Sequence, residues 1–277
     1  MGDPEVFART AAGCRERWSL ARDGSLPNRN RYVEPVRRAD GTPAVLKVGP
    51  ADDYEFQREL DAVEWFAGHG GVRVFAIDRV RGALLMERVF PGTELRELVP
   101  ADDAAATSVA ADVMRALWLP APAGSRLPTV REWGEESLTG HDAAVFAELC
   151  DTSGEPFVLH GDLHHENILR SSDGWVAIDP AGVIGEREYE IGALMHNPWP
   201  GLLDLPHPGR ILARRLDLLA ERLGFDRDRL AAWAWVIAKL SAAWSQSADE
   251  DPAFPLACAD LLAPLTAVST PSRRPAR

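Results

Sequence analysis

The sequence predicts an α+β protein with two lobes: a small β-rich N-terminal lobe, then a mainly helical C-terminal lobe. Up to about residue 88, short apolar runs lie between Gly, Pro and Asp residues, which is typical of strands. One helical pattern, at about 53–67, interrupts them. From about residue 93, apolar residues recur with the helical period. The expected helices there are 102–118, 143–149, 208–223, 226–245 and 257–265.

These patterns give the expected domain boundaries. Residues 1–88 form the N-terminal lobe, with a connecting segment at about 84–92, and residues 89–268 form the C-terminal lobe. The polar, proline-rich residues 269–277 are expected to be a disordered tail.

Composition narrows the class of protein. The 277 residues carry a net charge of −12, which disfavours nucleic acid or an anionic membrane as the main partner and agrees with a cationic small molecule. The three cysteines are scattered and indicate neither a disulfide framework nor a zinc pair. The acidic first residues do not resemble a signal sequence, and the longest apolar run is too short to span a bilayer. We therefore expect a cytoplasmic protein that binds neither nucleic acid nor membranes.

The strongest motif is the ten-residue segment 160–169, His-Gly-Asp-Leu-His-His-Glu-Asn-Ile-Leu, followed by Asp179. Asp162 precedes Asn167 by five residues, and Asp179 comes later on another segment, which is the spacing of phosphoryl-transfer loops. That reaction needs Mg²⁺, a group that orients the attacking hydroxyl and a cation on the phosphates. Because Mg²⁺ prefers hard oxygen ligands, Asn167 and Asp179 are the candidate metal ligands, and Asp162 is the candidate base.

The local pattern around the motif predicts a hairpin. Residues 167–170 and 175–178 are expected to form two strands around a Ser-Ser-Asp-Gly turn at 171–174. Asn167 and Asp179 would then lie at the outer ends of paired strands. A zinc site at His160, His164 and His165 is disfavoured, because no cysteine or fourth ligand stands nearby.

Lys47 is the candidate cation. It lies inside the apolar strand expected at 43–48, where burying an ammonium is costly unless it meets an anion. Nucleotide phosphates and a carboxylate of the next helix would supply that anion. The helix offers Glu55, Glu59 and Glu64, any of which would otherwise belong to a solvated face.

These residues together resemble the aminoglycoside phosphotransferases, and within them the streptomycin 6-phosphotransferase and hydroxyurea-resistance kinase branch. The family resemblance lies in His160-Gly161-Asp162, Asn167 and Ile178-Asp179. The branch resemblance lies in segments 159–167, 175–180 and 182–187, and the whole runs from about Trp18 to about Trp244.

The resemblance implies a protein-kinase-like fold, ATP as the nucleotide with GTP not excluded, and Mg²⁺. It assigns the roles given above to Asp162, Asn167 and Asp179, makes His160 structural, and favours Glu59 as the partner of Lys47, with Glu55 second. It implies that backbone groups of Glu87 and Val89 pair with adenine; the alternative is an ordinary strand that leads into a loop. The segment 23–30 would cover the phosphates, although it lacks the Gly-x-Gly-x-x-Gly pattern.

Candidate substrate residues follow from the same resemblance. Glu186 and Glu190 are four apart and would share a helix face that holds ammonium or guanidinium groups; the alternative is a solvated face. Asn197 would line the pocket. Trp233, Trp235 and Trp244 would stack on a substrate ring or, as is more usual for helical aromatics, belong to the core.

The expected function is that of an ATP- and Mg²⁺-dependent O-phosphotransferase acting on a small molecule, first of all streptomycin, with antibiotic resistance as the outcome. Hydroxyurea, or a sugar or amino-alcohol metabolite, is the alternative acceptor. A nucleotide-binding regulator without turnover is a further alternative, against which the intact Asp162, Asn167, Asp179 and Lys47 argue.

Overall fold

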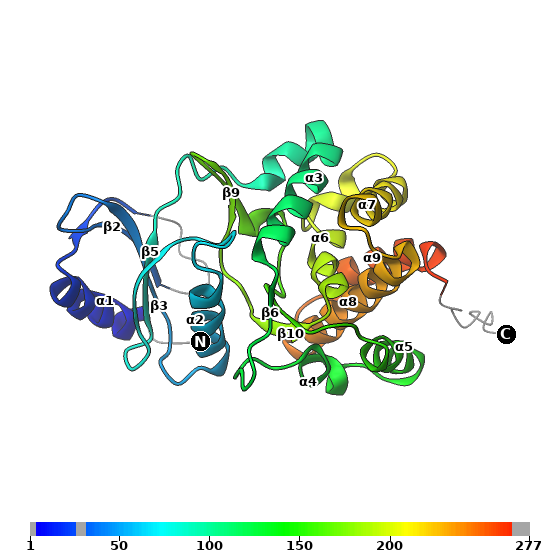
Figure 1. The fold of residues 1–277 in the computed structure, drawn as a ribbon, viewed down its shortest axis with the longest axis horizontal. Coiled ribbons are helices and arrows are strands. Elements are labelled where there is room, and N and C mark those ends of the chain that lie inside the picture. The colour runs from blue at the N-terminus through cyan, green and yellow to red at the C-terminus, as the bar shows by residue number, and fades with distance from the viewer. Residues whose placement is uncertain (1–3, 26–31, 268–277) are drawn as a thin grey trace. The chain divides into compact units, whose positions relative to one another are not determined.

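A computed structural model describes residues 4–25 and 32–267 (Figure 1). The chain divides into two compact units, one of residues 1–93 with 169–182 and the other of residues 94–168 with 183–277. The expected boundary at residue 88 differs from this division, because the segment 169–182 packs with the first unit. Val176 and Ile178 of that segment join the apolar core of the first unit. The tail expected at 269–277 lies outside the described residues.

The first unit is built on a five-stranded antiparallel sheet with strand order β1-β2-β3-β5-β4. Its elements are α1 (Pro4–Trp18), β1 (Ala21–Arg22), β2 (Tyr32–Arg37), β3 (Pro43–Val48), α2 (Tyr54–Phe66), β4 (Val74–Asp78) and β5 (Ala83–Glu87). The predicted hairpin is present as β8 (Ile168–Ser171) and β9 (Gly174–Ala177), shifted by about one residue from its expected bounds.

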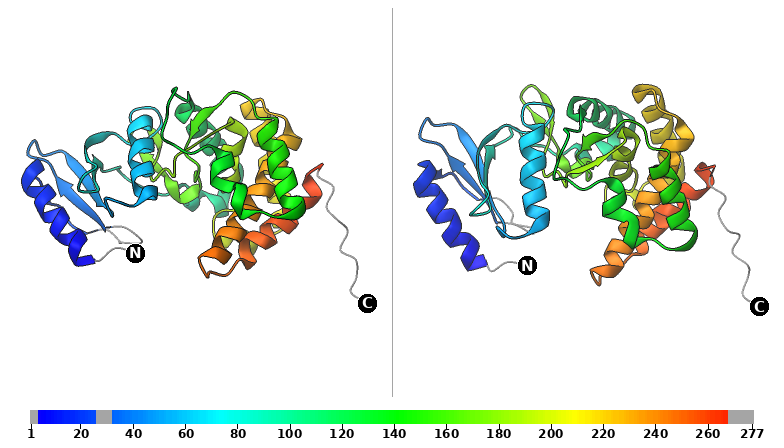
Figure 2. Two further views of the ribbon diagram at one scale, coloured as in Figure 1. Left: turned by 90° about the horizontal axis from the view of Figure 1, so that it is seen from below. Right: turned by 60° about the horizontal axis from the view of Figure 1, so that its bottom comes forward.

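The two helices cover opposite faces of this sheet (Figure 2). Successive side chains of a strand point to opposite faces, so Leu46 of β3 packs in the core that includes α1, whereas Val45 packs in the core that includes α2. Lys47 has the same parity as Val45 and therefore belongs to the α2 side.

Helix α1 was missing from the expected elements, which included one helix in this region. Its buried residues Phe7, Ala11 and Cys14 are spaced by four and three, the period of a helix face packed on a core. Helix α2 was predicted, and Asp53 begins it by accepting a hydrogen bond from the amide of Phe56 at 2.9 Å.

The second unit is mainly helical and confirms the predicted helices. Its elements are η1 (Leu95–Leu98), α3 (Val99–Leu117), β6 (Leu119–Pro120), α4 (Val130–Gly134), η2 (Glu135–Ser137), α5 (Gly140–Asp151), β7 (Phe157–Leu159), η3 (His165–Asn167), β10 (Val183–Gly185), η4 (Arg187–Ile191), α6 (Gly192–Met195), η5 (Gly201–Asp204), α7 (Pro208–Leu223), α8 (Arg227–Ser247), α9 (Ala253–Leu262) and η6 (Ala263–Leu265). Trp233 and Trp235 of α8 are buried, and Trp244 stacks on Trp133 with ring centroids 5.1 Å apart. These three tryptophans therefore belong to the packing of the helices.

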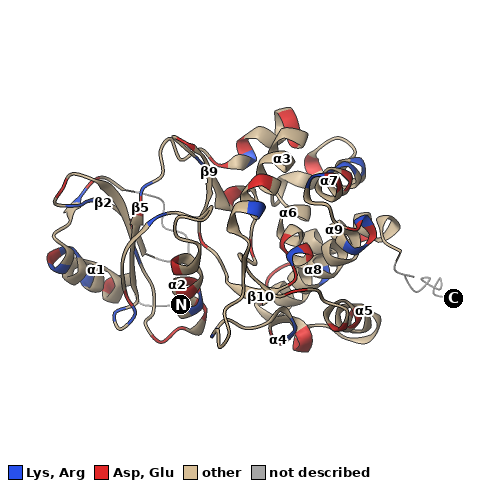
Figure 3. Ribbon diagram, viewed as in Figure 1, with Lys and Arg blue, Asp and Glu red and all other residues tan. Residues whose placement is uncertain are grey.

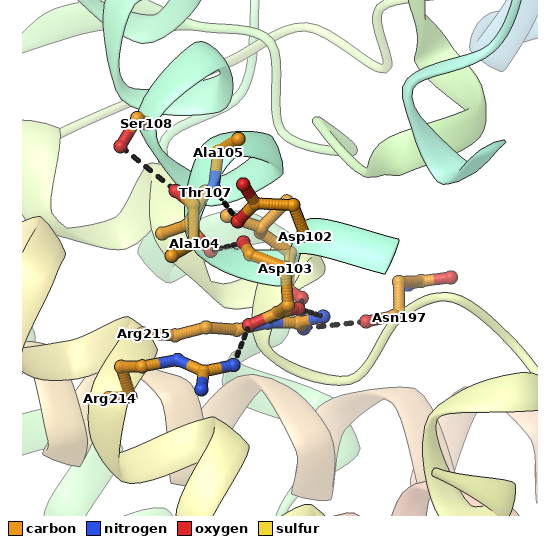
Figure 4. Close-up of polar contacts among 10 residues, drawn as sticks. Asp102, Asp103, Ala104, Ala105, Thr107, Ser108, Asn197, Arg214 and Arg215 are labelled. Carbon is orange, nitrogen blue, oxygen red and sulfur yellow. Dashed lines mark hydrogen bonds and ion pairs between the residues drawn. The ribbon is translucent and has the colours of Figure 1, made fainter. Parts of the chain in front are cut away.

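A buried ion pair ties α3 to α7 in this unit (Figure 4). Arg215 is fully buried, and its Nε and Nη2 donate to Asp103 Oδ1 at 2.9 and 2.6 Å. Its Nη1 donates to the backbone carbonyls of Leu194 and Asn197 at 2.8 and 2.7 Å. Arg214 adds a bond to Asp103 Oδ2 at 3.1 Å. The pair thus fixes the chain after α6 as well as the two helices.

Charged residues of both signs are interspersed along the outer helices. Helices α1 and α7 each carry both arginines and acidic residues (Figure 3). Within the described ranges, no helix is long and apolar enough to cross a lipid bilayer.

Candidate functional site

The first group of candidate residues centres on Lys47. Its Nζ lies 2.6 Å from Glu59 Oε1 and 3.0 Å from Asp179 Oδ1. Burial by itself would lower the pKa of Lys47, but the two carboxylates outweigh it and raise the pKa, so the side chain is a buried cation. Of the three glutamates considered on α2, Glu59 is the one that meets Lys47, while Glu64 bonds Arg79 at 2.8 Å.

Asp179 follows β9 in a left-handed backbone conformation, with φ of 55°. Aspartate is one of the few residues that adopts this conformation without a large penalty. Its side chain is 45% exposed, in contrast to the buried ammonium of Lys47 that it contacts. The exposed part of this carboxylate remains accessible to a ligand.

The second group lies in the loop between β7 and β8. Asn167 Nδ2 donates to the backbone carbonyl of Asp162 at 2.9 Å, and the amide of His164 donates to the same carbonyl at 3.0 Å. The carboxylate of Asp162 is about half exposed, with Oδ2 3.7 Å from His164 Nε2. Because the amide nitrogen of Asn167 is directed at Asp162, its Oδ1 is left as a hard oxygen ligand.

Glu190 supports this loop from within the second unit. Its Oε2 accepts the amide of His160 at 2.8 Å and its Oε1 accepts the amide of Gly161 at 2.9 Å. The side chain is buried, and Gly161 has φ of 78°, which favours glycine. Glu190 therefore positions the loop that carries Asp162, in place of the substrate contact predicted for it.

The buried carboxyl of Glu190 has a perturbed pKa. Burial raises its pKa from the ordinary 4.5 to about 7, against the opposing effect of the two amide hydrogen bonds. The folded state therefore holds this proton over a pH range in which the unfolded state has lost it. The free energy of unfolding should fall by about 3 kcal/mol on this account as the pH rises from 4.5 to 7.

This expectation can be measured by denaturant unfolding of the unsubstituted protein and of Glu190→Gln across that pH range. The unfolding free energy of the unsubstituted protein minus that of the variant should fall by about 3 kcal/mol as the pH rises from 4.5 to 7, because only the unsubstituted protein carries the titrating group. His196 acts in the opposite sense, because burial lowers its pKa to about 4, so its contribution to stability is lost as the pH falls from 6.5. Since His196 is present in both proteins, its contribution cancels in the difference. A pH-independent difference would contradict the assignment.

The other predicted substrate residues are also engaged inside the second unit. Glu186 is buried and accepts hydrogen bonds from Arg229 Nε at 2.7 Å, the Gly154 amide at 3.0 Å and the indole of Trp233. Residues 187–191 form a 3₁₀ helix, so the expected shared face of an α-helix with Glu190 is not formed, and neither carboxylate is solvated. Asn197 is buried, with its Nδ2 donating to the carbonyl of Ala193 at 2.8 Å.

At the predicted connecting segment, β5 ends at Glu87. The amide of Glu87 donates to the carbonyl of Arg73 at 2.9 Å, and its carboxylate accepts from Arg73 Nε at 2.7 Å. Val89 packs against the α2 side of the sheet core. Of the expected phosphate-covering segment, residues 26–30 lie outside the described residues.

The three histidines have separate surroundings. His160 Nδ1 accepts the amide of Asp162 at 3.3 Å, which is the kind of structural role predicted for it. His165 is fully buried, and burial together with the nearby Arg215 lowers its pKa well below the usual value. No cluster of three or more His, Cys, Asp or Glu side chains suited to a metal occurs among the described residues.

The chain matches the model of a family described as aminoglycoside/hydroxyurea antibiotic resistance kinase over residues 17–249. A streptomycin 3''-kinase of Klebsiella pneumoniae is 36% identical over 248 residues, covering 83% of this chain and 90% of that protein. A streptomycin 6-kinase of Streptomyces griseus is 32% identical over 250 residues (84% and 79%). A hydroxyurea phosphotransferase of Kitasatospora aureofaciens is 34% identical over 237 residues (79% and 67%).

A solved structure shows the same fold. The crystal structure of a thermostable mutant of aminoglycoside phosphotransferase APH(4)-Ia, in a ternary complex with ADP and hygromycin B, matches with a TM-score of 0.64 at 15% identity, covering 93% of this chain and 99% of that one. The predicted kinase-like fold, a β-sheet lobe followed by a mainly helical lobe, is confirmed.

Proposed function

Because the chain belongs to the aminoglycoside/hydroxyurea antibiotic resistance kinase family, we propose that it transfers the γ-phosphoryl group of ATP to a hydroxyl of a small molecule, with Mg²⁺ as cofactor and streptomycin as the first substrate. The observation that carries this proposal is the buried Lys47 held by Glu59 and Asp179, together with the loop in which Asn167 binds the backbone of Asp162. These are a cation for phosphates, a base for a hydroxyl, and oxygen ligands for a metal.

Each of the two proposed metal ligands is of a type that suits Mg²⁺. Asp179 presents a half-exposed carboxylate and Asn167 an amide oxygen, and both are hard ligands of the type that Mg²⁺ accepts alongside water and phosphate oxygens. When bound, the metal would neutralise charge on the phosphates. Lys47 would bind phosphate oxygens, oriented by its bond to Glu59.

Asp162 would act on the acceptor. Its half-exposed carboxylate accepts the proton of the attacking hydroxyl as that oxygen forms its bond to the γ-phosphorus and the bond from phosphorus to ADP breaks. Glu190 keeps the carboxylate in place through the amides of His160 and Gly161. Backbone groups at Glu87 and Val89 remain our proposal for the adenine contact.

Streptomycin is favoured over other acceptors by the relatives and by charge. Streptomycin kinases match most of the chain at 31–36% identity, and the net charge of −12 suits a cationic substrate. The sequence resembles the 6-phosphotransferase branch without fixing which hydroxyl is phosphorylated, and one of the relatives is a 3''-kinase. Hydroxyurea is the second candidate, because a hydroxyurea phosphotransferase also matches at 34% identity.

The test is a turnover assay with Mg²⁺ and either ATP or GTP against streptomycin, hydroxyurea, hygromycin B and choline, with the product identified by mass and by phosphorus–proton NMR. We expect ADP release that depends on streptomycin and stops when Mg²⁺ is chelated. Turnover with hydroxyurea or choline alone would contradict streptomycin as the substrate and leave the assignment as a kinase in place. Tight binding of Mg²⁺-nucleotide without turnover on any acceptor would favour the regulator.

A further inference from the structure

A cavity of about 290 Å³ lies within the second unit, away from Asp162 and Asn167. The antiparallel pair of β7 and β10 has two ends: Leu159 leads into the Asp162 loop, and Phe157, paired with Gly185, lies at the other. The cavity adjoins this other end. It is bounded by the start of α4, the end of α5 and the chain from Ile184 to Glu186.

The lining is largely apolar, with one acidic and one basic side chain. Val130, Pro156 and Ile184 supply apolar surface, and Glu186 and Arg131 supply the charges. Arg131 is already paired with Asp151, and its Nη1 lies 3.8 Å from Glu135.

The charges around the cavity do not balance. Arg131 and Arg229 face three carboxylates, those of Glu186, Asp151 and Glu135, which leaves one negative charge in excess. Burial raises the pKa of the Cys150 thiol to about 11. The three carboxylates also raise this pKa, and Arg131 opposes them. Among these ion-paired groups the carboxylates outnumber the arginines by one, which favours a cationic ligand over an anionic one.

We propose that this cavity is a second ligand site for a compact cation with an apolar body, such as an aryl amidine or aryl amine. The volume is close to the lower limit of small-molecule pockets, which are mostly apolar with a few polar groups that orient the ligand. Glu186 Oε2 accepts the Gly154 amide at 3.0 Å and retains a lone pair for a donor of the ligand.

The site is connected to the Asp162 loop through the 3₁₀ helix η4. Glu186 stands immediately before η4, and Glu190 near its end accepts the amides of His160 and Gly161. Tyr189 of the same helix packs edge-on against Trp233, whose indole bonds Glu186. A ligand that bonds Glu186 should therefore alter the protection of the His160 and Gly161 amides.

Cys150 is a built-in reporter of occupancy. The chain has three cysteines, and Cys14 and Cys258 are fully buried, so a small alkylating reagent such as iodoacetamide should modify Cys150 first. The probes are benzamidine, benzamide and benzoate, which have nearly the same shape and are cationic, neutral and anionic. Benzamidine should slow alkylation saturably, by about tenfold at ten times its Kd. Benzoate should give no protection.

A cavity-filling variant supplies the control. A Cβ added at Gly154, which lines the cavity, would meet only Glu186 Oε2, at 3.9 Å, so Gly154→Met is the variant chosen to occupy the cavity. Gly13→Met on α1, where nothing lies within 4 Å, is the matched glycine replacement outside the cavity. Benzamidine should protect Cys150 from alkylation in the Gly13→Met variant but not in the Gly154→Met variant.

Three results would overturn the site: no protection by benzamidine, equal protection by benzoate, or protection that survives Gly154→Met. The comparison of the three probes in the unsubstituted protein holds even if Gly154→Met does not fold. Hydrogen exchange of the His160 and Gly161 amides tests the connection between the cavity and the Asp162 loop. If benzamidine fully protects Cys150 and the exchange of these amides is unchanged, the connection is contradicted. None of these readouts depends on the identity of the phosphoryl acceptor.

Discussion

Asp162→Asn is expected to lower kcat by about 10²–10⁴-fold, the usual contribution of a positioned general base. The amide that replaces the carboxylate cannot accept the hydroxyl proton, whereas its size and the backbone bonds of the loop are kept. The carbonyl of Asp162, which receives the amide of His164 and Asn167 Nδ2, is untouched by the change. The KM for ATP and the midpoint of thermal unfolding should therefore stay close to those of the unsubstituted protein.

The measurement is steady-state turnover with the acceptor identified by the assay above, together with nucleotide binding by calorimetry. Asp173→Asn is the matched control, since Asp173 is an exposed aspartate in the turn between β8 and β9. Its kcat should be unchanged. A loss of less than tenfold in Asp162→Asn would remove Asp162 from the role of base.

Asp103→Ala is expected to lower the free energy of unfolding by about 3–5 kcal/mol, because it leaves the charge of a fully buried arginine without its carboxylate. Arg215 would keep its two backbone carbonyl partners, which cannot neutralise a cation. Since those carbonyls belong to Leu194 and Asn197, the chain after α6 should lose protection along with the contact between α3 and α7.

The same two helices provide the control for this effect. Asp112 of α3 pairs with Arg222 of α7 at 2.8 Å, but there the side chains are 58% and 35% exposed. Asp112→Ala should cost less than about 1 kcal/mol, as exposed ion pairs do. Denaturant unfolding of both variants checks the contrast, and equal losses would contradict the role given to burial.

The elements that the sequence predicted correctly are those whose signal is local. Helix α7 has the predicted bounds because its apolar residues keep a helical period from Pro208 to the left-handed Gly224 that ends it. Lys47 was predicted to meet a carboxylate of the next helix, since it lies inside an apolar strand and a buried ammonium needs an anion. The structure brings it to Glu59 and Asp179.

The misplaced residues are carboxylates whose partners lie far away in the sequence. Glu186 and Glu190 were expected to face a substrate, and the sequence pattern of acids four apart agreed with that. Glu186 accepts hydrogen bonds from Arg229 and Trp233 of α8. Glu190 accepts the amides of His160 and Gly161. Nothing in a four-residue spacing distinguishes a carboxylate that binds a ligand from one that holds a loop.

The sequence by itself determined the division into a β-rich and a mainly helical part, the hairpin, and the identity and spacing of Asp162, Asn167 and Asp179. Those depend on side-chain periodicity and on turn residues a few positions apart, which are properties of the local chain. Only the tertiary structure decided that residues 169–182 pack with the N-terminal sheet, that Glu190 holds the Asp162 loop, and that Arg215 is neutralised by Asp103. The partner that a buried charge finds is set by packing across the whole chain, because desolvation makes an unpartnered charge too costly to keep.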